Sequence, residues 1–498
     1  MKHTALLRVV VLLLAMLLVL PLMACGNDTP DQPDTPDQPS NPSTPDTPVD
    51  PEQPTEPVQT AESVLNAIPK KAFEEGFEFL VAASASYENV IFVEQFTNDD
   101  DIDGNIVHDA LFERDMMIEE YFGIDIYYDD VLDSAMFGKI GNTVRSGDDI
   151  YSLVLGALSA TALPMFTNDL LWDLSSVESI DLTQPWWNKN SVEAFTMNDQ
   201  IYMATGAITN RVVFAPYGML VNFRLREAAG LPDPYEMVHD NTWTLENFEA
   251  MIIGTSTQLN GDDLWDVNDF YGLAPSQDSE TAWFFAAGGR MVEKTPSGEL
   301  QVVYEEEDNY NLLSWITDMY QGDDVMRYVG LYDSNTAFKE SRAIFHSTAL
   351  GDISKLADME DQYGFLPMPK MDEAQEEYYS NTNRYINTFA LLPSSVQDPE
   401  TMGAVIEALA AVSQFTSLDK QYDTVLLNRK AVDEQSKENL KIIVESSFYD
   451  MGYVLDPAEV SKSILNAIRD DQELGPIFAS LRDPVNTKLE EYTDKFQD

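Results

Sequence analysis

The chain has 498 residues, of which 29 are Lys or Arg and 86 are Asp or Glu, so its formal net charge is −57. Binding to nucleic acid, or flat against an anionic membrane, requires a cationic surface, so this charge balance argues against both partners. Apolar residues make up 44% of the chain, which is enough for a large buried core, and a chain of this length favours two domains.

The first 25 residues have the pattern of a secretion signal. Two cations, Lys2 and Arg8, are followed by an unbroken apolar run from Val9 to Leu20, and Ala24 stands before Cys25. A charged segment, an apolar segment and a small residue at the cleavage point predict a signal peptide over residues 1–25. The apolar run is too short to span a bilayer comfortably as a helix of the mature protein.

Cys25 is the only cysteine of the chain, so no disulfide can form within it. Its place at the expected cleavage point resembles the lipobox of bacterial lipoproteins. The resemblance implies that the Cys25 thiol carries diacylglycerol, with palmitate among the acyl groups, and that the mature protein is anchored to the outer side of the cell membrane. An ordinary signal peptide with an incidental cysteine is the alternative.

A proline stands at every third position from Pro30 to Pro57, with Asp, Thr, Gln, Ser and Glu between the prolines. Polyproline II has three residues per turn, so the prolines would line one edge of an extended rod. At 3.1 Å per residue the repeat would reach roughly 85 Å. We expect residues 26–71 to be a disordered, Pro-rich stalk and lead-in that holds a folded body away from the membrane. A structureless spacer and a ligand for a proline-binding domain are the alternatives.

Strand and helix patterns alternate after the stalk. Residues 77–83, 124–128 and 150–155 are short apolar runs typical of buried strands, and helical periodicity covers residues 107–122 and 132–144. This order predicts a parallel sheet with helices on both faces. Further on, the sequence predicts a strand over 213–223 and helices over 225–229, 244–253, 401–413 and 461–469, with Thr242 or Thr244 as the N-cap of the second helix.

Four stretches together resemble the family-one extracellular solute-binding proteins, the lipid-anchored receptors of carbohydrate ABC importers. They are residues 107–126, 197–231, 338–369 and 379–393. Each stretch alone is a weak signal, whereas their order and spacing behind a lipobox are specific. One departure is that Val221-Asn222 stands where the family has tyrosine and asparagine.

The resemblance implies an α/β fold of two lobes with a hinge and an interlobe cleft, similar to periplasmic binding proteins. Lobe one would comprise residues 72–208 and 386–430, and lobe two residues 209–385 and 431–498. It also implies a monomer that binds a small carbohydrate without chemical change and delivers it to the permease subunits of an ABC transporter. Closure of the lobes around the hinge would signal that the solute is bound.

A sugar presents C–H faces and hydroxyl edges, so its site needs flat aromatic rings and fixed hydrogen-bonding groups. The aromatic candidates are Trp283 with Phe284 and the tandem Trp186-Trp187. Two glycines shortly after Phe284 would let the backbone approach the solute. At most one ring of the tandem can line a cleft while the other packs. We expect the remaining tryptophans to fill the core, as Trp172, Trp265 and Trp315, or to staple a helix, as Trp243.

The polar candidates lie at predicted strand ends and hinge crossings. They are Ser84, Glu94, Thr205, Asn210, His346, Asn383 and Arg384. His346 could instead be a packing residue. Arg384 could instead pair with one of the many carboxylates.

Two acidic loops suggest calcium, but calcium is the less favoured interpretation of both, and for the first loop a tight turn before the helix is favoured. Asp99, Asp101 and Asp103 match the first half of an EF-hand loop, but Ala110 occupies the closing position, which needs a bidentate carboxylate. The second loop resembles the calcium loop of some carbohydrate receptors, although Gln258 and Asp263 depart from that pattern. Its candidate ligands are Asn260, Asp262, Asp266 and Asp269.

The sequence offers little support for an enzyme. After the signal, the histidines are His108, His239 and His346, which are far apart, and no HExxH or GxSxG motif is present. We therefore expect a binding protein without a catalytic site or cofactor. A surface glycoside hydrolase or lyase, which needs only a carboxylate pair, and a stalked adhesin for cell-surface glycans are the alternatives.

Overall fold

The computed structural model divides the chain into two units, Met1–Pro57 and Val58–Asp498. It describes residues 59–84, 86–87, 91–92, 95–97, 102, 104–261, 264–295, 298–327, 330, 332–427 and 434–496. The predictions for Cys25, the proline repeat, Glu94, Asp262 and the three aspartates of the first acidic loop therefore lie outside the described residues.

The first lobe is built on a four-stranded sheet in the order β13-β5-β1-β4. The strands are β1 (Glu78–Ala83), β4 (Asp125–Asp130), β5 (Leu153–Ala157) and β13 (Thr388–Leu391). β1 is parallel to β4 and to β5, whereas β13 returns antiparallel to β5. The predicted parallel sheet is thus confirmed, and β13 adds a strand from far along the chain.

The helices of the first lobe begin and end where the sequence provides caps. α3 (Ile106–Phe122) starts at Asn105, whose side chain accepts hydrogen bonds from two backbone N–H groups, and it ends at Gly123 in the left-handed conformation (φ 74°). α4 (Asp133–Arg145) connects β4 to β5, and α13 (Pro399–Gln414) is buried along most of its length. Among the described residues no single helix is long and apolar enough to cross a membrane, although α13 and the adjoining helix up to Val425 pass that test as a pair bent by 42°.

α2 (Ala61–Ala67) belongs to the folded body, although its residues fall in the range assigned to the lead-in. Thr60 and Ser63 form a capping box at its start, in which each side chain accepts from the other residue's backbone N–H. Val64 and Leu65 are buried, and the helix packs against α13 and α3.

The second lobe is built on a sheet in the order β11-β6-β10-β7. The strands are β6 (Tyr217–Asn222), β7 (Tyr271–Leu273), β10 (Ala343–Ala349) and β11 (Tyr363–Leu366). β10 is parallel to β7, and β6 is antiparallel to both β10 and β11. The strand predicted from residue 213 begins four residues later, because Asn210–Val213 form the 3-10 turn η3, capped by the Thr209 side chain.

The helices around the second sheet include α9 (Leu245–Ile252), which confirms two sequence predictions. Thr244 is its N-cap and accepts a hydrogen bond from Asn247 N, and Trp243 packs edge-on against Phe248 at 5.8 Å, as a hydrophobic staple does. The other helices of this lobe are α7 (Phe223–Ala228), α8 (Pro234–His239), α10 (Ser279–Ala286), α11 (Glu307–Gln321), α12 (Asp333–Lys339), α15 (Glu434–Glu445), α16 (Met451–Leu455), α17 (Val460–Arg469) and η4 (Leu350–Leu356).

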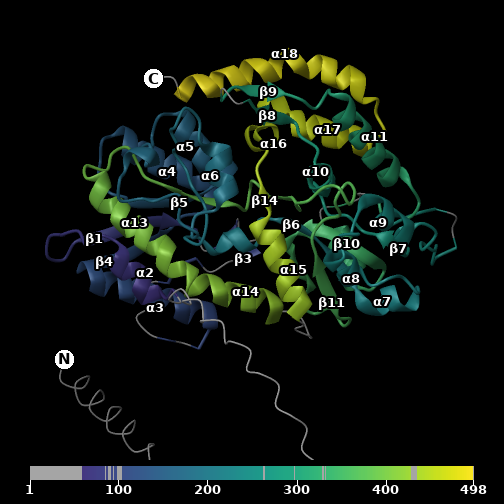
Figure 1. Cartoon of the computed structure of the whole chain (residues 1–498), viewed down its shortest axis with the longest axis horizontal. Coiled ribbons are helices and arrows are strands. Elements are labelled where there is room, and N and C mark those ends of the chain that lie inside the picture. The colour runs from purple at the N-terminus through teal and green to yellow at the C-terminus, as the bar shows by residue number, and fades with distance from the viewer. Residues whose placement is uncertain are drawn as a thin grey trace, which may run out of the picture. The chain divides into compact units, whose positions relative to one another are not determined.

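Shorter elements complete the body. They are β2 (Ser86–Tyr87), β3 (Ile91–Phe92), η1 (Leu158–Ala162), α5 (Leu163–Thr167), η2 (Leu174–Ser176), α6 (Lys189–Phe195), β8 (Val292–Lys294), β9 (Leu300–Val302), β12 (Ser380–Asn381), α14 (Ser417–Leu427), β14 (Ser447–Phe448), η5 (Pro457–Glu459), α18 (Leu474–Thr493) and η6 (Asp494–Phe496). Figure 1 shows the two sheets on opposite sides of the segments that connect them.

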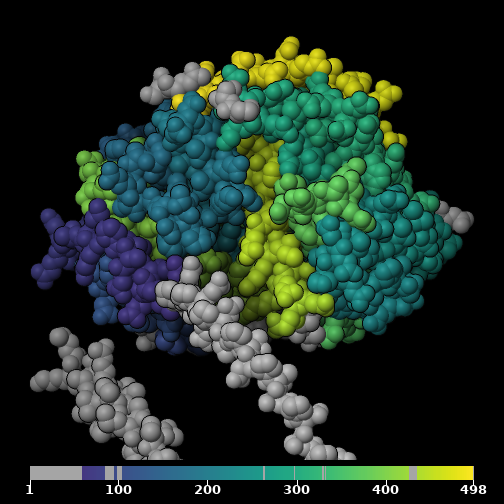
Figure 2. Space-filling view, viewed as in Figure 1, coloured from purple at the N-terminus to yellow at the C-terminus, as the bar shows by residue number. Residues whose placement is uncertain are grey.

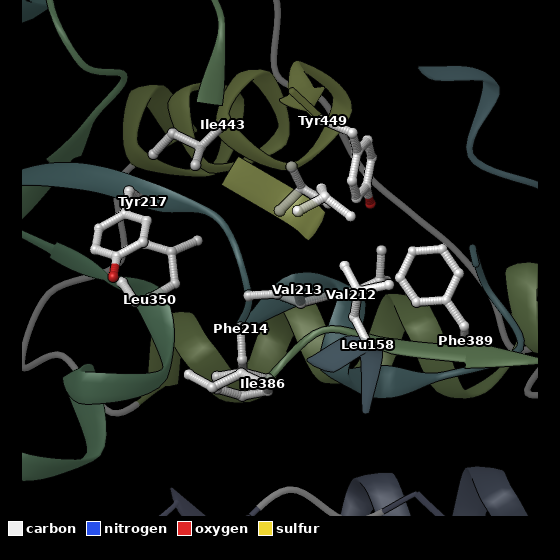
Figure 3. Close-up of a cluster of buried hydrophobic side chains, with 14 of the residues drawn as sticks. Leu158, Val212, Val213, Phe214, Tyr217, Leu350, Ile386, Phe389, Ile443 and Tyr449 are labelled. Carbon is white, nitrogen blue, oxygen red and sulfur yellow. The ribbon is translucent and has the colours of Figure 1, made fainter. Parts of the chain in front are cut away.

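A hydrophobic cluster fills the junction of the two lobes (Figure 3). Phe389 of the first sheet packs at 5.0 Å against Phe195 and at 6.1 Å against Tyr449, while Tyr217 of the second sheet belongs to the same cluster. Residues of both crossings, 210–216 and 382–387, contribute to it, so the hinge segments are anchored in apolar packing. The remaining labelled members are Leu158, Val212, Val213, Phe214, Leu350, Ile386 and Ile443.

Candidate functional site

Carboxyl ends of strands from both sheets meet the crossing segments at one place. η1 follows β5, and its Ser159 N–H donates to Arg384 O (3.1 Å) in the second crossing. η4 follows β10, and its Gly351 N–H donates to Phe214 O (2.9 Å) in the first crossing. Ligands of α/β sheets bind beyond the carboxyl ends of strands, so this junction is where a solute site is expected. Figure 2 shows a furrow between the lobes, with the yellow stretch that includes α15 and α16 at its floor.

A group of polar and aromatic side chains, which we call the junction cluster, gathers there: Tyr217, Asn383, Arg384, Tyr385 and Tyr453. Asn383 Nδ2 donates to the Tyr217 hydroxyl (3.3 Å), and Arg384 Nη1 donates to Tyr453 O (2.7 Å). Tyr385 is 40% exposed. Burial, and then the nearby Tyr453, Asp278, Asp352 and Glu280, raise the pKa of Tyr217 well above its ordinary value, so its hydroxyl stays protonated.

Arg384 is held rigidly within the junction cluster. Its Nη2 donates to Asp456 Oδ2 (2.8 Å), and its guanidinium lies 5.2 Å from the ring centroids of both Tyr385 and Tyr453. Arg384 is thus paired with a carboxylate, which was the alternative interpretation of this residue. A guanidinium fixed between two aromatic rings is also pre-organised to donate to a hydroxyl, so its role as a ligand contact stays a prediction.

The acids beside the junction cluster are paired with bases. Arg469 donates to Glu280 Oε1 (2.7 Å) and to Asp278 Oδ1 (3.1 Å), and Lys355 lies 2.7 Å from Asp352 Oδ1. Burial raises the pKa of Glu280 although Arg469 opposes the shift. Neutralised charges next to aromatic rings suit a neutral polyhydroxylated ligand better than an ion.

On the side of the first lobe, η1 is a π-helical turn of the kind often found at functional sites. The hydroxyl oxygens of Ser159 and Thr161 are buried and have no hydrogen-bond partner among the described residues. A buried hydroxyl without a partner is costly, which marks η1 as a place where a ligand hydroxyl could bind.

Three predicted polar contacts are buried in the framework of the hinge. Thr205 Oγ1 donates to Thr388 O (2.7 Å), and the carbonyl of Ser84 accepts from Gln95 Nε2 (2.8 Å) and Arg211 Nη2 (3.2 Å). Asn210 is buried at the start of η3. The prediction that these residues contact ligand stays open, but the structure shows Thr205 and the Ser84 carbonyl holding the crossing segments in place.

His346 is a buried packing residue of β10. Its ring stacks on Phe338 at 5.3 Å, its Nδ1 donates to Ala274 O (2.6 Å), and its Nε2 accepts from Asn335 Nδ2 (3.3 Å). Burial lowers the pKa of His346 to about 4, and the hydrogen bond to the Ala274 carbonyl offsets only part of this shift. The imidazole is therefore neutral at pH 7. These contacts match the packing interpretation of the sequence analysis.

Trp283 and Phe284 of α10 have no exposed surface in this structure. Trp283 lies 4.9 Å from Phe248, and its Nε1 donates weakly to Ser347 Oγ (3.4 Å). A Cβ on Gly289 would come 2.4 Å from the Phe284 ring, so this glycine makes room for a phenylalanine and not for a solute. Solute contact by either ring stays a prediction, and it would require α10 to rearrange.

Trp186 and Trp187 share one buried carboxylate. Trp186 Nε1 donates to Glu407 Oε1 (2.8 Å) and Trp187 Nε1 to Glu407 Oε2 (2.9 Å), so α13 holds both rings and both pack in the first lobe. Burial raises the pKa of Glu407 to about 7, although the two indole hydrogen bonds lower it in part.

The second acidic loop is stabilised from within. Asp269 Oδ1 accepts from Leu259 N (2.8 Å) and its Oδ2 from Asp266 N (3.0 Å). Within the described part of the chain, no three His, Cys, Asp or Glu residues are placed to hold a metal ion. Calcium at Asn260, Asp266 and Asp269 stays a prediction. The same loop corrects the expectation that Trp265 fills the core, because its side chain is 37% exposed.

Of the side chains at this junction, the sequence predicted Asn383 and Arg384 but not Tyr217, Tyr453 or the η1 hydroxyls. Tyr217 begins a strand and Tyr453 lies in a five-residue helix, so neither is marked by a local motif. The resemblance to a family with crossing segments was the one signal that pointed to this region.

No protein-family model matches the sequence, and no curated protein matches it either. Solved structures match the fold. UspC of M. tuberculosis is 12% identical with a TM-score of 0.54 and covers 82% of this chain and 100% of its own. ABC substrate-binding protein Lmo0181 of Listeria monocytogenes, in complex with cycloalternan, is 12% identical with a TM-score of 0.52 over 84% and 100%. A cyclo/maltodextrin-binding protein complexed with maltotetraose is 13% identical with a TM-score of 0.54 over 86% and 98%.

These matches confirm the predicted fold class. The chain has the two-lobe α/β fold of the solute-binding proteins, and the matches cover 98–100% of the length of those structures.

Proposed function

We propose that the protein is a lipid-anchored extracellular receptor that captures a sugar or oligosaccharide between its lobes and delivers it to an ABC importer. The observation that carries this proposal is the junction cluster, which places the exposed ring of Tyr385 and a fixed Arg384 on the second crossing, beside the buried Tyr453 of α16. Two solved proteins of the same fold hold cycloalternan and maltotetraose, which supports a carbohydrate as the ligand.

The chemistry of the cluster suits a sugar. A tyrosine ring offers a flat apolar face to the C–H side of a sugar, and the guanidinium of Arg384 and the amide of Asn383 offer donors to its hydroxyls. The buried hydroxyls of Ser159 and Thr161 lie on η1, so closure of the lobes would bring polar groups from both sides onto the solute.

The membrane part of the proposal rests on the sequence. A signal peptide that ends at Cys25 would export and anchor the protein, and the proline repeat would separate the body from the membrane. Replacement of Cys25 by serine should release the protein into the medium, and mass spectrometry of the wild type should find an acylated amino terminus. A wild type without an acyl group would contradict the anchor but leave the binding site untouched.

A thermal-shift screen of mono- and oligosaccharides tests the binding site. A ligand at about 100 times its Kd stabilises the folded state by about 2.7 kcal/mol, which is a measurable rise in Tm. We expect Tyr385→Ala, which removes the 40% exposed ring of the junction cluster, to weaken the shift, whereas Lys488→Ala, on the exposed face of α18, should leave it unchanged. Absence of a shift with every sugar would contradict the proposal, and cleavage of a sugar would favour the glycosidase alternative.

A further inference from the structure

A cavity of about 310 Å³ lies in the second lobe beside the start of β7 and the end of α11. Trp265 and Leu264 line it from the loop before β7, Tyr271 from β7 itself, and Val325 from the segment after α11. Tyr271 pairs with the first residue of β10, and the junction cluster lies beyond the other end of that strand. The seven residues of β10 span about 20 Å, so the cavity is separate from the furrow.

Trp265 forms an exposed aromatic platform in this cavity. Its side chain is 37% exposed and the adjacent Leu264 is 67% exposed, whereas the other six tryptophans are buried or half-buried. The ring lies 5.5 Å from that of Tyr271, whose hydroxyl donates to Asp266 O (2.7 Å). The Trp265 ring is therefore packed, at a tilt of 44°, against a residue that is itself held in place.

Charged side chains of both signs surround the Trp265 ring. Asp266, Asp323 and Arg327 line the same cavity. Asp266 Oδ1 accepts from Asn268 N (2.7 Å), and Arg327 Nη2 donates to Gln321 O (3.1 Å), so a carboxylate and a guanidinium are oriented before any ligand arrives. Acids alone would suit a cation. A flat ring with acceptors and donors at its edge suits a neutral ligand that has apolar faces and hydroxyl groups.

We propose that this cavity, the Trp265 pocket, is a second carbohydrate-binding site, and that it holds a sugar unit of an extracellular polysaccharide. Its volume is at the lower end of the range for small-molecule sites, which matches one or two sugar units of a longer chain. The pocket would keep the receptor beside the polymer, while the furrow takes up soluble fragments. The Trp265 pocket does not depend on the furrow's function, because it shares no residue with the junction cluster.

Affinity electrophoresis of the full chain in gels that contain soluble starch, xylan or mixed-linkage β-glucan tests the proposal. We expect at least one polysaccharide to retard the wild type, Trp265→Ala to weaken that affinity about tenfold or more, and Trp265→Phe to retain most of it. Leu259→Ala is the matched control, since Leu259 is 59% exposed but does not line the cavity.

Two further variants keep the result unambiguous. Arg327→Ala removes an exposed donor without touching the platform, so it should also reduce retardation even if Trp265→Ala lowers Tm. Tyr385→Ala, at the exposed ring of the junction cluster, should be retarded as strongly as the wild type. The proposal is overturned if no polysaccharide retards the wild type, if Trp265→Ala is retarded equally, or if Tyr385→Ala alone abolishes retardation.

Discussion

Arg211 and Asp133 form an ion pair that is almost completely removed from solvent, with Arg211 Nη1 at 3.1 and 3.0 Å from the two carboxylate oxygens. Arg211 belongs to η3 in the first crossing, and Asp133 is the first residue of α4 in the first lobe. Arg211 also donates to the carbonyl of Ser84 at the end of β1 (3.2 Å). The pair therefore attaches the hinge segment to the carboxyl edge of the first sheet.

Replacement of Asp133 by alanine would leave the Arg211 guanidinium buried without its carboxylate. Removing one partner of a buried pair costs about 3–5 kcal/mol of unfolding free energy. Urea unfolding followed by circular dichroism measures this loss. Glu491→Ala is the control, because the Lys488–Glu491 pair is exposed and should contribute at most about 1 kcal/mol. Equal losses in the two variants would contradict the role assigned to the buried pair.

Glu407 gives the stability of the protein a dependence on pH. Its pKa is raised from 4.5 to about 7 by burial, so the folded protein binds a proton more tightly than the unfolded chain does. The stability from this proton is fully present below pH 4.5 and is lost as pH rises to about 7, with a total loss on the order of 3 kcal/mol.

The difference between wild type and Glu407→Gln isolates this effect. The amide has one acceptor oxygen for two indole donors, so the variant should be less stable than the wild type at pH 5. The gap should shrink toward pH 8, because the variant has no carboxyl group to ionise there. Chemical denaturation at pH 5, 6, 7 and 8 measures the gap, and a gap that stays constant with pH would contradict the shifted pKa.

Trp283→Ala tests whether this tryptophan supports the core. The ring has no exposed surface and packs against Phe248 and, through it, Phe345, so its removal would leave a large cavity in the second lobe. Truncation of a buried tryptophan costs about 3–5 kcal/mol. A lower Tm in the absence of sugar would confirm the packing role. An unchanged Tm with a lost response to sugar would instead restore Trp283 as a ligand contact.

Local rules predicted much of the fold. α3 ends at Gly123, which adopts the left-handed conformation that favours glycine, and Trp243 packs on Phe248 at the start of α9. Both features can be predicted from a few neighbouring residues. Features that depend on distant partners could not be read in this way. Tyr453 lies beside Arg384, 69 positions earlier in the chain, and no periodicity reports such a contact.

The tryptophans show the same limit. Trp186 and Trp187 both donate to Glu407, which lies more than 200 positions away in the chain. Local sequence patterns therefore could not distinguish a packed pair of rings from a pair that contacts ligand. Trp265 was expected in the core because most tryptophans are largely buried, and its loop leaves it exposed. The resemblance to a family supplied the two-lobe architecture that local patterns alone did not.

α18 connects the two lobes, and its two ends contact different cores. Phe478 near its start packs at 4.9 Å against Tyr304, whereas Tyr492 near its end packs at 5.2 Å against Phe166 of the first lobe. Phe496, just beyond the helix, lies 5.0 Å from Phe166. The end of α18 thus reaches the first lobe, although the sequence analysis grouped residues 431–498 with the second.

Pro484 lies within α18 between these two contacts. A proline inside a helix removes a backbone hydrogen bond, so the helix is weakest at this point. We expect Phe496→Ala to release the C-terminal part of α18 from the first lobe while the part before Pro484 stays in place. Hydrogen exchange should then rise for residues after Pro484 and stay unchanged around Phe478. Phe478→Ala is the reciprocal variant, and it should raise exchange in the first part of the helix. Uniform exchange along α18 in either variant would show that the helix opens as one unit and that the proline does not divide it.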